Sequence, residues 1–370
     1  MRILCLEQFS KLGGGQLSLL DLLPALTRRG WEPIVATPGE GPLTHSATQL
    51  GIKVVTLSAA SYSSGQKTLA DVTRYAYESP KLICEIARMA SSTQIHLFYV
   101  NAPRLLPTAA FVARLRHIPL VFHCHNRIDQ RAGVFVAGPS LRLARARVIA
   151  CCRYAADPIR RFISSEHLAV VYNGVSQITR HAAGPRTKVR RIGIIGRVEP
   201  EKGQMEFVRA ARLLLKSFRD CRFSIIGAPL FSGAEYCTQV IEASRELPVE
   251  FLGWRDDVAT LLARLDLLAV PSSCLDSAPR VILEAFAAGV PVVAFPSGGI
   301  PELVKDEETG FLTTAATAEA LARRISLILE MAPAKLQGVI DSARRQWEHE
   351  HTLSIYQNRV ADFLSQAAAR

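Results

Sequence analysis

Residues 191–203 join an apolar run to a charged turn bounded by glycines: Arg191-Ile192-Gly193-Ile194-Ile195-Gly196-Arg197-Val198-Glu199-Pro200-Glu201-Lys202-Gly203. The run before Gly196 is apolar at successive positions, as in parallel strands that are covered on both faces. Helical periodicity follows over residues 203–218. Strand, turn and helix in this order predict one unit of a doubly wound α/β sheet.

The same alternation of apolar runs and helical stretches extends along the chain in both directions. Strands are expected at residues 2–7, 32–37, 52–57, 95–100, 119–124, 148–151, 168–172, 191–196, 222–227, 249–252, 267–271 and 291–295. Helices are expected between these strands, for example at residues 16–29 and 104–116, and they include residues 203–218, 257–265, 280–288, 317–331 and 335–366. Residues 173–190 have neither pattern and contain Asn173-Gly174 and Gly184-Pro185, which indicates a linker.

This arrangement predicts an α/β fold of two doubly wound, Rossmann-like domains that face one another across a cleft. We place an N-terminal domain at residues 1–175 and a C-terminal domain at residues 186–345. The last helix, over residues 346–370, is expected to pack back on the N-terminal domain. Because ligands of such sheets bind at the carboxyl ends of the strands, the residues after each strand are the candidates for a site.

The net charge of +11 is confined to one half of the sequence. Residues 1–185 contain 21 Lys and Arg but 10 Asp and Glu, whereas residues 186–370 contain 23 of each. A one-sided excess favours an anionic partner such as a membrane surface, a lipid phosphate or nucleic acid. Arginines interleaved with apolar residues over 141–162 fit a lipid surface, or else an ordinary solvated helix face. The sequence has no nucleic-acid recognition motif, and we expect no nucleic-acid partner.

Targeting and redox signals point to the cytoplasm. No apolar run approaches the roughly 20 residues that span a bilayer. We therefore expect a cytoplasmic protein that can associate peripherally with the inner face of the membrane. The eight cysteines are scattered without a C-x-x-C pair, which predicts reduced thiols packed in the core.

Three glycines, Gly13-Gly14-Gly15, follow the first predicted strand and precede a helix. Glycines let backbone N–H groups approach a ligand closely, and a helix N-terminus attracts a phosphate. The spacing is neither that of a Walker loop nor that of the dinucleotide fingerprint, so a dehydrogenase is poorly supported. The alternative interpretation is a tight turn between strand and helix.

Arg197 and Lys202 lie five residues apart in the turn after residues 191–196. The guanidinium fork and the ammonium point charge are both suited to phosphate oxygens, so the pair could clamp a diphosphate. A solvated basic loop is the alternative.

Asp276 and Glu284 flank the start of the helix predicted at 280–288, which follows the strand at 267–271. The helix N-terminus between them can face a phosphate, and the Glu284 carboxylate can accept hydrogen bonds from both hydroxyls of a ribose. Alternatively Asp276 caps the helix and Glu284 is merely exposed. Glu284 stands inside an apolar helix, where an acid without a function is unusual.

Two histidines, His123 and His125, stand at the end of the strand predicted at 119–124. We expect them on opposite faces of that strand and therefore predict no metal site shared by the two rings. His123 is predicted to be an ordinary buried histidine. The sequence has no D-x-D motif, and cations with helix dipoles can neutralise a diphosphate in place of a metal.

The chain resembles a known family, the large retaining glycosyltransferase family four, which has the GT-B fold. The resemblance rests on Gly13-Gly14-Gly15, Tyr172-Asn173-Gly174-Val175, Gly196-Arg197, Glu201-Lys202-Gly203, Phe251-Leu252-Gly253-Trp254, Asp276, Glu284-Ala285, Gly289-Val290-Pro291, Gly298-Gly299, Glu302 and Thr309-Gly310-Phe311-Leu312. It covers almost the whole chain and is densest from 191 to 312.

The resemblance implies roles for individual residues. Arg197 and Lys202 are expected to bind the donor diphosphate, Glu284 the ribose, and His125 the transferred sugar. The remaining nucleotide-sugar contacts are expected from Gly14, Gly15, Gly196, Gly253, Trp254, Pro279, Arg280, Val281 and Ile282. Asp276 stands where the family has glutamate, near the donor sugar, so the sugar preferred is in question.

The resemblance also implies a function. The expected enzyme is a retaining, metal-independent glycosyltransferase that uses a UDP or GDP type sugar, needs no cofactor, and builds cell-surface polysaccharide. Its N-terminal domain would bind a glycan or lipid-linked acceptor and its C-terminal domain the nucleotide sugar. His125, Arg197, Lys202 and Asp276 are the expected catalytic residues. The alternatives are a sugar-nucleotide epimerase of similar fold and a degenerate, non-catalytic sugar-nucleotide-binding protein.

Overall fold

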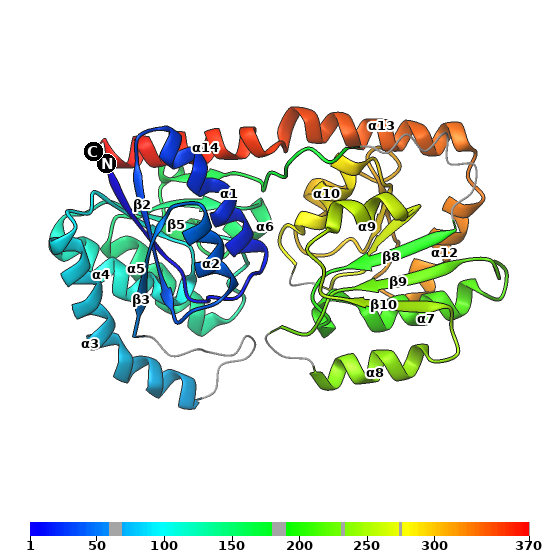
Figure 1. Cartoon of the computed structure of the whole chain (residues 1–370), viewed down its shortest axis with the longest axis horizontal. Coiled ribbons are helices and arrows are strands. Elements are labelled where there is room, and N and C mark those ends of the chain that lie inside the picture. The colour runs from blue at the N-terminus through cyan, green and yellow to red at the C-terminus, as the bar shows by residue number, and fades with distance from the viewer. Residues whose placement is uncertain (59–68, 180–189, 231–233, 274–275, 370) are drawn as a thin grey trace. The chain divides into compact units, whose positions relative to one another are not determined.

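The structure is a computed structural model that describes residues 1–58, 69–179, 190–230, 234–273 and 276–369. The chain divides into two compact units, Met1–Asn173 with Ser354–Arg370, and Gly174–Leu353. Each unit is a parallel sheet covered by helices (Figure 1). Of the predicted linker, residues 180–189 lie outside the described residues, as does Cys274.

The sheet of the first unit has seven parallel strands in the order β3-β2-β1-β4-β5-β6-β7. They are β1 (Arg2–Leu6), β2 (Glu32–Pro38), β3 (Lys53–Leu57), β4 (Leu97–Val100), β5 (Leu120–Cys124), β6 (Arg147–Ala150) and β7 (Leu168–Val170). Every residue of β4 and β5 is buried, because apolar side chains at successive positions are covered on both faces of the sheet.

The helices of the first unit are α1 (Gly14–Arg28), α2 (Pro42–Gln49), α3 (Leu69–Ser92), α4 (Leu106–Arg116), α5 (Arg131–Leu143), α6 (Arg153–Ala156) and α14 (Leu353–Ala368). The strand order reverses direction after β3, so right-handed crossovers put α1 and α2 on one face and α3, α4 and α5 on the other. The same reversal opens a crevice at the carboxyl ends of β1 and β4, the switch point of this sheet.

The C-terminal helix α14 belongs to the first unit, although the rest of that unit ends at Asn173. The hydroxyl of Tyr356 donates to the carbonyl oxygen of Ser18 at 3.0 Å. Arg29 Nη1 lies 2.6 Å from Asp362 Oδ1. These contacts hold α14 against α1.

The second unit has six parallel strands in the order β10-β9-β8-β11-β12-β13. They are β8 (Arg191–Ile195), β9 (Arg222–Ile226), β10 (Val249–Gly253), β11 (Leu267–Val270), β12 (Val292–Ala294) and β13 (Phe311–Leu312). The helices are α7 (Gln204–Leu214), α8 (Ala234–Ser244), α9 (Val258–Arg264), α10 (Arg280–Ala288), α11 (Ile300–Leu303), α12 (Ala318–Leu329) and α13 (Pro333–Glu350). The switch point of this sheet lies between β8 and β11.

Two expectations about these elements need correction. The sequence did not predict β13 as a strand, because two residues are too short to show periodicity. The helical stretch at 335–366 is two helices, because the chain leaves helical geometry at His351 and pairs with Val175 through a hydrogen bond from Leu353 N–H to Val175 O at 3.0 Å.

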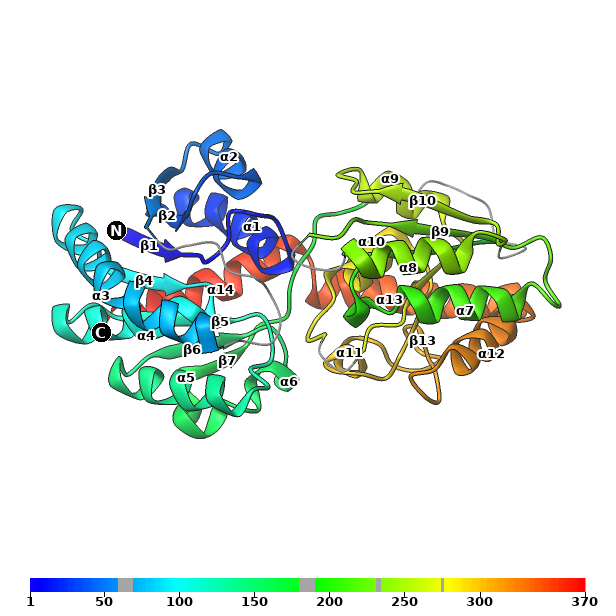
Figure 2. The same cartoon turned by 90° about the horizontal axis from the view of Figure 1, so that it is seen from below.

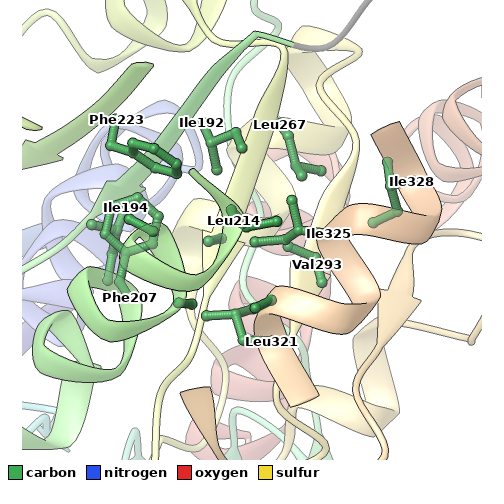
Figure 3. Close-up of a cluster of buried hydrophobic side chains, with 14 of the residues drawn as sticks. Ile192, Ile194, Phe207, Leu214, Phe223, Leu267, Val293, Leu321, Ile325 and Ile328 are labelled. Carbon is green, nitrogen blue, oxygen red and sulfur yellow. The ribbon is translucent and has the colours of Figure 1, made fainter. Parts of the chain in front are cut away.

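A core cluster of the second unit fills the space between one face of its sheet and the helices α7 and α12 (Figure 3). Ile192 of β8 and Leu267 of β11 are fully buried. Phe207 of α7 packs edge-on against Phe223 of β9, with ring centroids 5.8 Å apart. A rigid core of this kind holds the loops that follow the strands in place.

The described cysteines are all free thiols. Five are buried and Cys237 is half-buried, but Cys84 on α3 is exposed, which corrects the prediction that all pack in the core. Helices in the described ranges are all too short or too polar to cross a bilayer.

Candidate functional site

The first set of candidate residues lies at the switch point between β1 and β4. Glu7 directly follows β1 and is fully buried. Its Oε1 accepts hydrogen bonds from the backbone N–H groups of Gln8, at 2.7 Å, and Phe9, at 3.2 Å. Nδ2 of Asn101, the residue after β4, donates to Glu7 Oε2 at 2.6 Å. Burial outweighs these hydrogen bonds and raises the pKa of Glu7 to about 7.

Asn101 connects Glu7 to His125. Its Nδ2 also donates to the carbonyl oxygen of Gly15 at 3.2 Å, which fixes the orientation of the amide. Its Oδ1 lies 2.7 Å from His125 Nε2. Because an amide oxygen can only accept, Nε2 carries the ring hydrogen and Nδ1 is the basic nitrogen of neutral His125. The network therefore sets both the orientation and the tautomer of this histidine.

The rings of His123 and His125 are stacked, with centroids 3.9 Å apart. The expectation that they point to opposite faces is wrong, because residues two apart along a strand share a face. His123 is fully buried, as predicted, and its Nδ1 lies 2.5 Å from the hydroxyl of Tyr99. Burial lowers the pKa of His123 well below its usual value, so this ring is neutral.

The glycine turn opens beside the same histidine. Helix α1 begins at Gly14. A Cβ atom at Gly15 would lie 3.1 Å from Cδ2 of His125. The structure thus brings together three of the sequence-predicted residues, Gly14, Gly15 and His125.

The second set of candidate residues lies at the switch point between β8 and β11. Lys202 ends a short 3-10 turn after β8, and its Nζ lies 2.5 Å from Oδ2 of Asp276, which follows β11. The backbone N–H of Ser273 donates to the carbonyl oxygen of Glu201 at 2.8 Å. The loops after the two strands are therefore joined by a backbone hydrogen bond and by an ion pair.

Two glycines allow these loops to approach so closely. Gly203 has a φ of +75°, and a Cβ atom there would lie 2.0 Å from the carbonyl oxygen of Pro271. Gly298, after β12, has a φ of +57°, and a Cβ there would lie 2.0 Å from the carbonyl oxygen of Asp276. Both positions need a residue without a side chain, since the opposing atoms belong to the backbone.

Arg197 also has a carboxylate partner. Its Nη1 lies 2.6 Å from Oε2 of Glu199, which is buried. The carbonyl oxygen of Arg197 accepts a hydrogen bond from Gln204 Nε2 at 2.7 Å, so the turn after Gly196 is held from both sides. Both sequence-predicted cations of this loop, Arg197 and Lys202, are thus paired in the structure.

Helix α10 begins at Arg280, with Pro279 as its N-cap residue. Glu284 lies one turn farther along and is half-buried, as is Val281. Ile282 is fully buried. Its side chain is part of the interior, so only its backbone lies at the helix N-terminus.

Gly253 and Trp254 are farther from the cations than the other candidates. Gly253 ends β10, the edge strand of the sheet, Trp254 follows it, and β9 separates β10 from β8. Two strand spacings amount to about 10 Å. Trp254 is exposed, and its Nε1 donates to Asp256 Oδ1 at 3.1 Å.

Two family models match the chain over most of its length. Glycosyltransferase Family 4 matches residues 12–177, and Glycosyl transferases group 1 matches residues 189–331. The chain belongs to glycosyltransferase family 4. The predicted GT-B type of fold, with two Rossmann-like α/β domains, is confirmed by these matches and by the solved structures that resemble it.

Solved structures and curated proteins resemble this family 4 chain. HepE of Anabaena, crystallised with UDP and glucose, is 25% identical, has a TM-score of 0.83, and is aligned over 99% of both chains. The amylovoran biosynthesis glycosyltransferase AmsK of Erwinia amylovora is 28% identical over 48% of this chain and 45% of its own. The D-inositol 3-phosphate glycosyltransferase of Salinispora arenicola is 34% identical over 48% of this chain and 43% of its own. The chain thus spans about half the length of the curated relatives that it matches.

No group of three or more His, Cys, Asp or Glu side chains within the described ranges of this family 4 chain is arranged to hold a metal ion. The residues that sequence reasoning missed are Glu7, Asn101 and Glu199. Glu7 and Asn101 each follow a buried strand directly, which is the signal that should have drawn attention to them. Only the strand order shows that β1 and β4 are neighbours.

Proposed function

We propose that this family 4 chain transfers a sugar from a nucleotide-diphosphate sugar, of the UDP or GDP type, to a saccharide or lipid-linked acceptor. The observation that carries the proposal is the cluster of Arg197, Lys202 and Asp276 at the switch point of the second sheet. Parallel α/β sheets bind their ligands at this position. The likeness to HepE, crystallised with UDP and glucose, supports UDP as the nucleotide.

The cations of this cluster suit a diphosphate that gains charge as it leaves. Lys202 offers a point charge and Arg197 a planar fork of donors. Their carboxylate partners, Asp276 and Glu199, hold both cations in position before the donor binds. Phosphate oxygens would then compete with the carboxylates, and the N-terminus of α10 would add partial positive charge. Glu284 is proposed to bind the ribose hydroxyls.

The first unit is proposed to present His125, Gly14 and Gly15 to the sugar. Glu7 and Asn101 would act on the reaction only through His125, as positioning residues. With Nε2 bonded to Asn101, the neutral ring has its acceptor lone pair on Nδ1. A fixed tautomer avoids the cost of reorienting the ring during the reaction.

The finer parts of the proposal follow from the family and from the charge distribution. The transfer would retain the anomeric configuration, and the departing phosphate would accept the proton of the acceptor. Cations and helix dipoles would replace a divalent metal, and no cofactor would be needed. Polysaccharide synthesis on the cytoplasmic side is proposed because AmsK is named for amylovoran biosynthesis.

Calorimetric titration of the purified chain with UDP, GDP and ADP, each with and without EDTA, tests the proposal. We expect tight binding of one nucleotide, unchanged by EDTA and lost in Glu284→Ala. Glu319→Ala is the matched control, since Glu319 is an exposed acid in the first turn of α12. Failure of a folded wild-type chain to bind any of the three would favour a degenerate protein, and a requirement for metal would overturn the metal-independent part.

A further inference from the structure

Three helices of the first unit, α3, α4 and α5, pack next to one another on the face of the sheet opposite to α1 and α2 (Figures 1 and 2). A groove with a volume of about 640 Å³ runs between them. Its walls are mainly apolar and include Tyr75, Ile83, Pro107, Phe111, Pro139 and Leu143. We call this surface the α3–α4–α5 face. None of these lining residues is among those proposed to bind the nucleotide sugar.

Large apolar side chains are concentrated on the same face. Six of the eleven exposed ones among the described residues lie on these helices: Tyr77, Phe111, Leu115, Phe135, Val136 and Leu143. Phe135 is 78% exposed and Leu115 is 60% exposed. Exposed apolar residues are ordinarily scattered singly over a protein surface. A cluster of them therefore marks an interaction surface.

The charges around the groove select an anionic partner. Helices α4 and α5 contain four arginines, Arg114, Arg116, Arg131 and Arg142, and neither Asp nor Glu. Arg142 lies on the rim of the groove, with its guanidinium 5.0 Å from the centroid of Phe162. Two acids of α3 whose side chains the structure describes have their own partners: Glu78 pairs with Arg74, and Glu85 accepts from the backbone of Ser58.

The groove also contains a buried hydroxyl group, that of Tyr75. This hydroxyl has no hydrogen-bond partner among the described residues. The hydroxyls of Thr108 and Ser140, by contrast, donate to carbonyl oxygens of their own helices. A ligand that fills the groove with hydrocarbon and places an ester or phosphate oxygen at Tyr75 would satisfy this group.

We propose that the α3–α4–α5 face docks on a membrane that contains anionic phospholipid. Phe135, Leu115 and their neighbours enter the boundary between head groups and acyl chains, the arginines contact lipid phosphates, and the groove holds one acyl chain. A second copy of this chain fits less well, because a symmetric dimer through this face would oppose arginine to arginine. The inference stands or falls independently of the glycosyltransferase proposal.

Sedimentation with vesicles tests the docking surface on the full chain without nucleotide. We expect binding to vesicles of phosphatidylcholine with about a third phosphatidylglycerol, and roughly tenfold or more weaker binding to phosphatidylcholine alone. The double variant Leu115→Ser/Phe135→Ser should lose about tenfold or more of the binding, because two apolar side chains no longer leave water. The matched control, Leu50→Ser/Leu327→Ser, removes equally apolar side chains that are exposed on α12 and at the end of α2, and should bind as wild type.

The contributions of the arginines and of the groove to vesicle binding are tested by separate variants. Arg131→Gln/Arg142→Gln should weaken binding by about fivefold for each charge at low salt and make it less salt-dependent. Tyr75→Phe keeps the ring and should weaken binding by a few fold, since one hydrogen bond is lost. Equal binding to both kinds of vesicle, or equal losses in the α3–α4–α5 variant and its control, would overturn the proposal. A dimer in analytical ultracentrifugation that Leu115→Ser/Phe135→Ser dissociates would assign the face to a second copy instead.

Discussion

The switch points of the two sheets are built by the same topology but hold opposite chemistry. Between β1 and β4, Glu7 and Asn101 form a buried pair in which an amide and backbone N–H groups surround the carboxylate. Between β8 and β11, Lys202 and Asp276 form an ion pair. The two sheets thus share a topology, and the residues after the strands make the chemistry of the two switch points different.

The direction of pKa shifts shows the same contrast between the two units. Among the described residues, hydrogen bonds rather than a cation oppose the burial of Glu7, and burial raises its pKa to about 7. Burial acts in the same direction on Asp266 of the second unit, but hydrogen bonds from Arg191 and from the backbone N–H groups of residues 190 and 191 lower its pKa below the usual value. The first unit thus tolerates a carboxyl group by favouring its protonated form, and the second by pairing the ionised form.

The largest expected effect comes from breaking the charged switch point. Lys202→Ala should lower kcat of sugar transfer by roughly 10²–10³-fold, because it removes a cation from the developing charge of the departing diphosphate. Thermal unfolding should shift little, since the Lys202 side chain is 22% exposed and lies outside the core. Kinetics with the nucleotide sugar identified by calorimetry would measure the loss.

Lys216→Ala is the matched control, because Lys216 is an exposed lysine just after α7. It should leave kcat unchanged. An unchanged rate in Lys202→Ala would remove the basis for assigning the second switch point to a diphosphate. Equal losses in both variants would mean that net positive charge, rather than this position, is what matters.

The second-largest expected effect is a dependence of stability on pH, which comes from Glu7 at the switch point between β1 and β4. The folded chain keeps the Glu7 proton up to a pH of about 7, whereas the unfolded chain loses it near its ordinary value of 4.5. The free energy of unfolding therefore falls as pH rises through this window, and by about 3 kcal/mol for a shift of this size. Glu7→Gln should abolish this pH dependence of the free energy of unfolding. Urea denaturation between pH 5 and 8, followed at the unfolding transition of the first unit, measures it.

Asp266→Asn sharpens the comparison of the two units, because Asp266 should change the free energy of unfolding with pH in the opposite direction to Glu7. The pKa of Asp266 is lower in the folded chain than in the unfolded chain. Asp266 therefore stabilises the fold at a pH above its pKa in the unfolded chain, and this stabilisation is lost as the pH falls through its pKa in the folded chain. The variant should be less stable than wild type at pH 7, and the difference should shrink under acid. Parallel pH dependences of Glu7→Gln and Asp266→Asn would contradict the contrast between the units.

The smallest expected effect concerns the tautomer of His125. Asn101→Ala removes the acceptor at 2.7 Å from Nε2 and should lower kcat by roughly tenfold, the size of one hydrogen bond in a preorganised site. Nucleotide affinity should stay within about twofold of wild type, because the proposed nucleotide contacts are in the other unit. Asn126→Ala is the control, since Asn126 is exposed beside His125. A loss of nucleotide affinity equal to the loss in kcat would argue against a positioning role.

Many of the strands and helices could be predicted from the sequence, because strands that are buried on both faces give continuous apolar runs. The helix predicted at 280–288 agrees with α10, and the strand predicted at 191–196 agrees with β8 to within one residue. The short strand β13 and the break between α13 and α14 were missed, since each depends on one or two residues. The prediction that His123 and His125 point to opposite faces was wrong, because residues two apart along a strand share a face and the two rings are stacked.

The sequence by itself determined which residues follow each strand, because apolar periodicity and glycine turns are local properties. It therefore indicated Arg197, Lys202, Asp276, Glu284 and His125 as candidates. Only the tertiary structure decided which of them have partners, because the strand order brings β1 beside β4 and β8 beside β11 across long stretches of chain. The Glu7–Asn101 pair spans 94 residues and the Lys202–Asp276 pair spans 74, so no local pattern could have connected them.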